Sequence, residues 1–250
     1  MFEVQELLGA NSKIPNFYRM ALSFNEILSD DLYFTKGTAK KIVETIVSIL
    51  FELKECEDAY FAFIEIENNF CKSISEIGTA DNPNLRLRML FGHFYIHSII
   101  ALRYSWKISS YIFNDPKMCE DNKYRRNKIK EAIKNSEATF DRSIADRYLN
   151  MFKEDTELFS KYVNIRNSIE HVENEELVIT EMKYIRNGST YDIYKAMFEG
   201  FYCTKQMRIT FENLYSYLED FIAMLINIKK PKNYPIYIEK LSTDNKIFNS

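Results

Sequence analysis

Apolar residues recur at helical spacing over most of the central chain. Residues 38–77 contain neither Gly nor Pro, and Ile42, Ile46 and Leu53 belong to a series of apolar positions three or four residues apart. This pattern predicts one very long helix or two helices in line, ended by Gly78. A second run, at about 85–113, is apolar nearly all round, which is typical of a central helix in a bundle.

Further helices are expected nearer the C-terminus. The spacing predicts two of them at about 136–152 and 155–171, and a last one at about 204–228. Between these, residues 175–185 change to an imperfect alternation of apolar and polar positions, which favours a strand. Asn187-Gly188 follows as a strong hairpin-turn signal. We therefore expect a small two-stranded ribbon before the last helix.

Together these elements predict an all-α fold, an antiparallel helical bundle over residues 35–230. The hairpin, at about 176–196, is an insertion before the last helix. Residues 1–34 are expected to form an N-terminal helical arm, and residues 231–250 a polar C-terminal tail. No internal repeat is visible.

Composition supports this fold and narrows the function. Of the 250 residues, 46% are hydrophobic, which is enough for a sizeable core, while six Gly and five Pro are too few for a turn-dense β-sandwich. A formal charge of −3 excludes the class of strongly basic proteins that coat nucleic acids, so any contact with nucleic acid must be local. No export signal, membrane-length apolar run or CxxC pair is visible, and we expect a cytoplasmic protein with reduced thiols.

Residues 117–136 form the most charged segment of the chain. Its basic residues include Lys123, Arg125, Arg126 and Lys128. Such a run is typical of a solvated helix face, and it is also what a patch that contacts phosphates requires. Both interpretations stay open at the level of sequence.

Two histidines, His93 and His97, are four residues apart and share one helix face, as two metal ligands would. Their local sequence is apolar and supplies no carboxylate. Glu65, Glu67 and Asn69 could face them from the long helix at 38–77. Packed or surface imidazoles explain the pair more simply, so the sequence predicts no metal site and no cofactor.

Several familiar catalytic motifs are missing. The chain contains no GxxxxGK[ST], GxGxxG, HExxH or GxSxG. Their absence argues against most nucleotide-driven and acyl-transfer enzymes.

The third histidine closes a polar stripe on the helix expected at 155–171. Asn164, Asn167, Ser168 and His171 follow the spacing i, i+3, i+4 and i+7 and so lie on one face. The opposite face carries the apolar residues Leu158, Tyr162, Ile165 and Ile169. Because the polar face is made of amides, a hydroxyl and an imidazole rather than Lys and Glu, we interpret it as a surface that meets a ligand or a partner.

Arg166, Asn167 and His171 also form a motif. An Arg, a polar follower and a His after four intervening residues resemble the signature of the HEPN superfamily (higher eukaryotes and prokaryotes nucleotide-binding). The resemblance implies a bundle of four or five helices and a homodimer in which two copies of His171 share one cleft. It also implies metal-independent RNA cleavage to 2′,3′-cyclic phosphate and 5′-hydroxyl ends, in bacterial defence or as a toxin restrained by a separate regulatory or antitoxin protein.

The chemistry of these residue types agrees with that implication. RNA cleavage without a metal needs a base, an acid and a cation for the charged phosphorane, and His and Arg supply these groups. Arg166 and His171 are about 140° apart on an ideal helix, so a loosened helix end or a partner chain must bring them to one phosphate. Asn164, Ser168 and the basic segment are the expected RNA contacts.

Ordinary structural roles are also open to the three motif residues. Arg166 could pair with Glu170, Asn167 could be an exposed amide, and His171 could be a residue favoured at a helix C-terminus. The alternative function is a non-catalytic HEPN-like dimeric module that binds a nucleotide, a nucleic acid or a protein. A third possibility is a helical interaction protein in which the motif is accidental.

Overall fold

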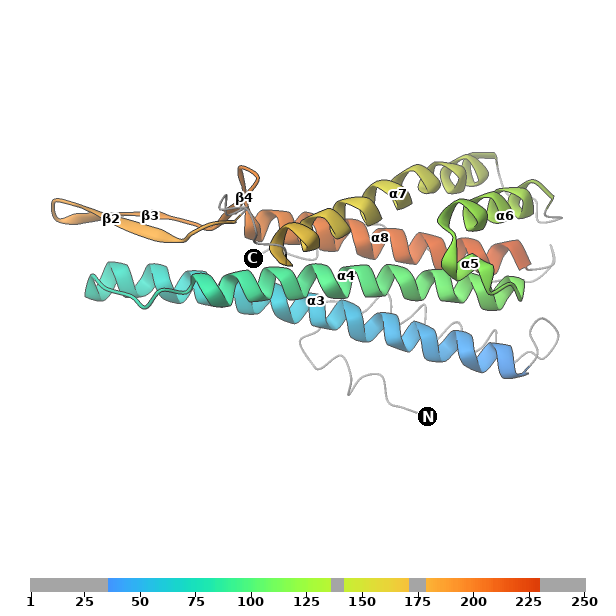
Figure 1. Cartoon of the computed structure of the whole chain (residues 1–250), viewed down its shortest axis with the longest axis horizontal. Coiled ribbons are helices and arrows are strands. Elements are labelled where there is room, and N and C mark those ends of the chain that lie inside the picture. Colours follow the sequence, from blue (N-terminus) through green and yellow to red (C-terminus); the bar gives the residue numbers. More distant parts are fainter. Residues whose placement is uncertain (1–35, 136–141, 171–178, 230–250) are drawn as a thin grey trace. The chain divides into compact units, whose positions relative to one another are not determined.

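The computed structural model describes residues 36–135, 142–170 and 179–229, and this part of the chain is mostly helical (Figure 1). The helices are α3 (Lys36–Ile77), α4 (Asn84–Phe113), α5 (Lys117–Glu120), α6 (Asn122–Asn135), α7 (Arg142–Glu170) and α8 (Cys203–Lys229). The strands are β1 (Ile179–Thr180), β2 (Lys183–Asn187), β3 (Thr190–Tyr194), β4 (Met197–Phe198) and β5 (Phe201–Tyr202). The expected N-terminal arm and C-terminal tail lie outside the described residues.

The long helices α3, α4 and α8 occur where the periodicity predicts them. α3 is one continuous helix, and it ends at Gly78, whose φ of 79° lies in the left-handed region that glycine adopts without strain. The N–H of Gly78 donates to the carbonyls of Ser73 and Ile74, which closes the last turn. α4 ends before Asn114, which also has a positive φ, of 50°.

The expectation of two helices at 136–152 and 155–171 is wrong. α7 is a single helix through Arg142–Glu170, and residues 136–141 lie outside the described part. The expected boundary between the two helices falls in the polar run Lys153-Glu154-Asp155, which contains neither Gly nor Pro. Each of these residues can continue a helix, so polarity alone does not end one.

The hairpin signal at Asn187-Gly188 is confirmed, although the first strand is shorter than expected. β2 and β3 pair antiparallel from Lys183 opposite Tyr194 to Asn187 opposite Thr190, and Gly188 has a φ of 64°. β1 does not extend this ribbon, because it pairs with β4 in a separate sheet of order β1-β4-β5. The sequence did not indicate β4 and β5, since strands of two residues are too short to show a period.

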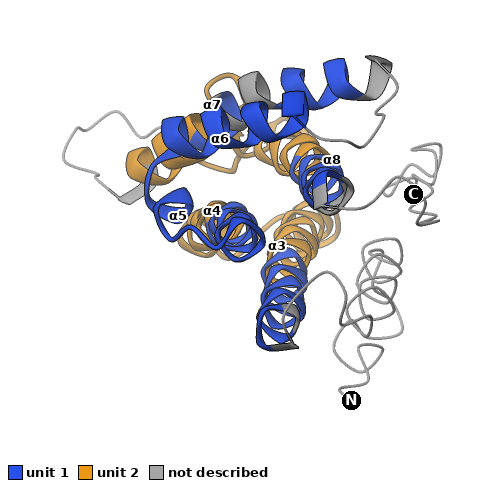
Figure 2. Ribbon diagram, turned by 90° about the vertical axis from the view of Figure 1, so that its right-hand side faces the viewer, with its two compact units in different colours: residues 1–54, 100–159, 214–250 blue, residues 55–99, 160–213 orange. Residues whose placement is uncertain are grey.

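The chain forms two compact units, coloured separately in Figure 2. The described residues of unit 1 are 36–54, 100–135, 142–159 and 214–229, and those of unit 2 are 55–99, 160–170 and 179–213. α3, α4, α7 and α8 each contribute residues to both units. Among the described helices, none combines the length and the apolar character that crossing a membrane would require.

Aromatic residues make the core of unit 2. The ring of Phe91 on α4 lies 6.4 Å from Phe63 on α3 and 5.4 Å from Phe198 on β4, between ring centroids. Tyr95 and Tyr162 are also in ring contact, at 5.8 Å, and burial raises the pKa of both phenols. These contacts connect α7 to α4, and so they fix the face of α7 that carries the motif residues.

Unit 1 has its own core, in which α5 and α6 pack through a few apolar residues. Met118, Ile129 and Ile133 are buried there. Asp121 caps α6, since its Oδ1 accepts the backbone N–H of Tyr124 at 2.9 Å, and this bond lowers the pKa of the carboxyl group. The described part of the charged segment, residues 117–135, is therefore a short helix followed by a capped one.

Candidate functional site

The motif residues that the structure describes lie at the C-terminal end of α7, in unit 2. Tyr162 and Ile165 are buried, and this apolar face holds α7 in its rotational position. Arg166 and Asn167 follow at half-buried positions. The Nε and Nη2 atoms of Arg166 both donate to Oδ1 of Asn167, at 3.2 and 2.7 Å. Asn167 thus holds the guanidinium in a defined orientation.

The described members of the polar stripe all reach the protein surface. Asn164 is exposed, whereas Asn167 and Ser168 are half-buried, and the hydroxyl of Ser168 donates to the carbonyl of Asn164 at 2.9 Å. His171 is the residue directly after the end of α7 and lies outside the described residues, as does the side chain of Glu170. The structure therefore brings Arg166 and Asn167 together, and the place of His171 stays a prediction.

Part of the basic segment lines a cleft of about 1100 Å³ in unit 1. Lys123 and Arg126 on α6 line it, together with Arg103, Tyr104 and Lys107 on α4. The Nζ atom of Lys107 lies 5.9 Å from the centre of the Tyr104 ring. Several cations beside aromatic rings form a surface suited to a phosphate backbone and unstacked bases.

The contribution of α4 to this cleft was not predicted. The run at 85–113 was interpreted as apolar nearly all round, although Arg103 and Lys107 are four residues apart and so lie on one helix face. The cleft also has acidic lining residues, Glu120 and Asp121. The carboxylate of Asp121 caps α6, so the partial positive charge of the helix N-terminus offsets part of its negative charge.

The proposed RNA contact at Arg125 needs correction. Arg125 is fully buried, and the centre of its guanidinium lies 4.0 Å from the ring centroid of Trp106. From this position it cannot reach a phosphate on the protein surface. Its spacing to the buried residues Ile129 and Ile133 is four and eight, which puts all three on the inner face of α6. Lys128, by contrast, is exposed.

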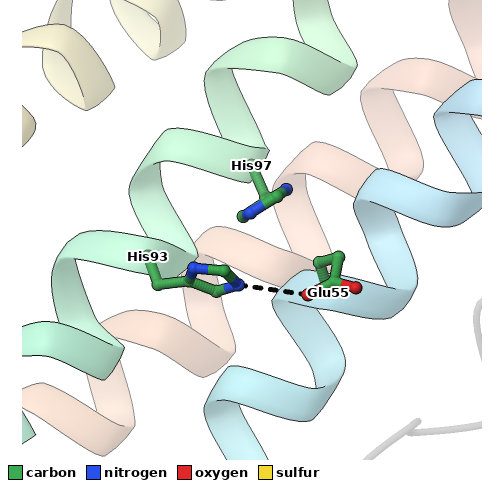
Figure 3. A group of neighbouring side chains, drawn as sticks. All are labelled: Glu55, His93 and His97. Atoms are coloured by element: carbon green, nitrogen blue, oxygen red, sulfur yellow. Dashed lines mark hydrogen bonds and ion pairs between the residues drawn. The ribbon is translucent and has the colours of Figure 1, made fainter. Parts of the chain in front are cut away.

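In the structure the histidine pair lies beside the carboxylate of Glu55, which the sequence did not indicate. His93 and His97 on α4 have ring centroids 4.1 Å apart, and Nε2 of His93 lies 3.1 Å from Oε2 of Glu55 on α3 (Figure 3). Suitable ligand atoms of the three residues all lie within 4.8 Å of one another. The sequence pattern had pointed to Glu65 or Glu67 as the carboxylate.

The residues expected opposite the histidines lie elsewhere in unit 2. Glu65 and Asn69 line a smaller pocket of about 360 Å³ with Arg86. Glu67 is buried and pairs with Lys195, at 3.7 Å between Oε2 and Nζ. Its Oε1 atom has no hydrogen-bond partner within the described part of the chain.

Replacing Glu67 with glutamine is expected to raise the free energy of unfolding by about 1 kcal/mol at pH 7.5. Burial raises the pKa of Glu67 in the folded protein, and the attraction of Lys195 only partly offsets this effect. The wild-type protein therefore carries an unfavourable charge above its folded-state pKa. The advantage of the variant should shrink as the pH falls through the folded-state pKa and disappear below 4.5, where the unfolded-state carboxyl group is also mostly protonated.

Urea unfolding of both proteins across this pH range measures the difference. Glu65→Gln is the matched control, since Glu65 is exposed on the same helix. A Glu67→Gln variant less stable than the wild type at pH 7.5 would mean that the pair with Lys195 outweighs the cost of burial.

Comparison of the chain with protein-family models, with curated proteins and with solved structures gives no significant match in any of the three.

Proposed function

We propose that the protein is a HEPN-type endoribonuclease that cleaves RNA without a metal ion and leaves 2′,3′-cyclic phosphate and 5′-hydroxyl ends. The observation that carries the proposal is the Arg166 guanidinium, held by Asn167 at the end of α7 and followed after four residues by His171. The mostly helical fold and the polar face of α7 support it.

The reaction needs no group beyond those of the motif. A base takes the proton of the ribose 2′-hydroxyl, whose oxygen attacks the adjacent phosphorus. The bond to the 5′-oxygen then breaks, and an acid gives that oxygen a proton. One imidazole is neutral and acts as the base while another is protonated and acts as the acid, so two copies of His171 from a homodimer suffice.

Arg166 binds the non-bridging phosphate oxygens in this scheme. Its planar fork matches two oxygens at once, and it stabilises the extra negative charge of the phosphorane. Asn167 acts through Arg166, because its Oδ1 accepts two of the guanidinium N–H groups. Asn164 and Ser168, on the same polar face, contact the RNA backbone nearby.

The cleft of unit 1 independently supports RNA as the ligand. Its cations, including Lys123 and Arg126, attract phosphates, while Tyr104 offers a ring on which a base can stack. Lys128 adds a positive charge on the exposed side of α6. A nuclease of this kind needs restraint in the cell, so we place it in bacterial defence or a toxin–antitoxin pair, with a separate protein as regulator.

Purified wild-type protein is expected to cleave a mixed RNA pool in the presence of EDTA, and His171→Ala is expected to leave the RNA intact. Product ends identified by mass spectrometry should be 2′,3′-cyclic phosphates and 5′-hydroxyls. Lys161→Ala is the control, because it changes an exposed residue of the same helix.

Three outcomes would contradict the proposal. Cleavage that stops in EDTA would indicate a metal-dependent enzyme, and equal cleavage by His171→Ala would show that the motif is not the site. RNA that raises the melting temperature of the wild-type protein without being cleaved would favour the non-catalytic binding module instead.

A further inference from the structure

We propose that Glu55, His93 and His97 form a binding site for a divalent transition metal ion of the Zn²⁺ type. The site lies within unit 2 and joins α3 to α4. It is independent of the proposed RNA cleavage, which uses none of these residues.

The spacing of the two histidines provides the first part of the argument. Residues four apart on a helix project from the same face one turn apart, and this arrangement lets two imidazoles reach one ion. Here the rings of His93 and His97 already lie 4.1 Å apart between centroids, at an interplanar angle of 50°. Both side chains extend from α4 on the side where Glu55 approaches (Figure 3).

The third ligand comes from the neighbouring helix. Oε2 of Glu55 lies 3.1 Å from Nε2 of His93, close to the separation of about 3.3 Å that tetrahedral ligands have around zinc at bond lengths near 2.0 Å. Ligand atoms of all three residues lie within 4.8 Å of one another. Small side-chain rotations would therefore bring His97 to the same ion.

Exposure makes those rotations possible and gives the ion a path of entry. The side chains of His93 and Glu55 are 45% and 51% exposed. Three protein ligands at the surface leave a fourth position for water, so the site is open rather than fully enclosed.

The ligand set selects the class of metal. Two imidazoles and one carboxylate suit Zn²⁺, Ni²⁺ and Cu²⁺, whereas Mg²⁺ and Ca²⁺ prefer sites made of oxygen atoms alone. Because the ion would connect α3 and α4, its binding should stabilise unit 2 increasingly as its concentration rises. The expected role is a metal clasp between two helices.

Zinc binding by metal-free protein without a histidine tag tests this proposal. Titration calorimetry with Zn²⁺ alone should give one ion per chain, and Zn²⁺ should raise the melting temperature. His97→Ala should weaken binding at least about 100-fold, since one of three ligands is lost. This variant retains the contact between Glu55 and His93, so it separates a metal site from a simple ion pair.

Two controls make the result specific. Glu55→Gln keeps a hydrogen-bonding side chain on α3 but loses the anionic ligand and should also weaken binding, whereas Glu65→Gln, an exposed residue of α3, should bind Zn²⁺ like the wild type. If His97→Ala does not fold, His97→Asn tests the same ligand. The visible spectrum of the Co²⁺ form should lack the thiolate charge-transfer band that Cys71 or Cys119 would produce.

The inference is overturned if wild type and His97→Ala bind Zn²⁺ equally, or if the Co²⁺ spectrum shows thiolate ligands. The proposed nuclease fails on different evidence, namely cleavage that is absent, lost in EDTA or insensitive to His171→Ala. RNA cleavage in EDTA by a protein that also binds Zn²⁺ through His97 would support both proposals.

Discussion

Replacing Arg166 with alanine is expected to lower the rate of RNA cleavage by about 10²- to 10³-fold, the usual cost of removing one preorganised donor to a charged transition state. The guanidinium is already oriented before substrate binds, because Asn167 accepts from both Nε and Nη2. Its charge therefore meets the developing phosphorane without further reorganisation. Initial rates on a single RNA substrate, with EDTA present, measure the loss.

The Arg166→Lys variant tests the fork separately from the charge. Lysine keeps a positive charge but binds phosphate through a single ammonium group, so it should recover only part of the lost rate. Asn167→Ala should lower kcat more than it raises KM, since Asn167 acts by positioning Arg166. If Arg166→Ala cleaves RNA as fast as the control Lys161→Ala, Arg166 contributes no more than an exposed cation of α7, and its proposed role is wrong.

The helices were predictable because they are long and because turn residues mark some of their ends. α3 has no Gly or Pro along its predicted run and stops at Gly78, and the apolar series of α8 identified that helix within a residue of each end. α7 was divided in error because its middle is polar. β4 and β5 escaped notice because each has only two residues. Periodicity thus identifies elements that are long enough to contain several repeats of the apolar spacing, and it misses shorter elements.

The polar stripe could be read from sequence because all its members lie on one helix. The metal ligands could not, because their approach depends on the connection between α3 and α4. A tight turn would place Glu65 and Glu67 opposite the histidines, at equal distances from the turn. In the structure Glu55 lies 22 residues before the end of α3, whereas His93 lies nine residues after the start of α4.

This offset has a simple geometric explanation. The 13 additional residues of α3 correspond to about 20 Å of helix. Residues 78–83 include no helix, and six extended residues also span about 20 Å. The connecting segment therefore runs back along α3 before α4 begins, as its trace in Figure 1 shows. Sequence periodicity contains no information on that path.

Replacing Arg125 with alanine is expected to lower the free energy of unfolding by about 3 kcal/mol, which is typical of deleting a large buried side chain. Arg125 is fully buried, with its guanidinium over the Trp106 ring at 4.0 Å, and Trp106 in turn contacts Phe159 at 4.7 Å between centroids. Alanine removes both the cation–π contact and the volume that fills this space. Equilibrium urea unfolding followed by circular dichroism measures the effect.

Lys128→Ala is the matched control, because Lys128 is an exposed cation on the same helix, and its loss should change stability by less than about 0.5 kcal/mol. Arg125→Met fills most of the volume without the charge and should recover part of the loss if packing contributes most. Stability unchanged in Arg125→Ala would mean that the guanidinium does not stay in the core. Arg125 would then return as a candidate phosphate contact, and RNA affinity would fall in Arg125→Ala as it does for a surface cation. Replacing a buried arginine lowers stability and leaves RNA affinity unchanged, whereas replacing a surface arginine lowers RNA affinity and leaves stability unchanged. The Arg125→Ala variant therefore distinguishes a structural role of this side chain from a role in binding RNA.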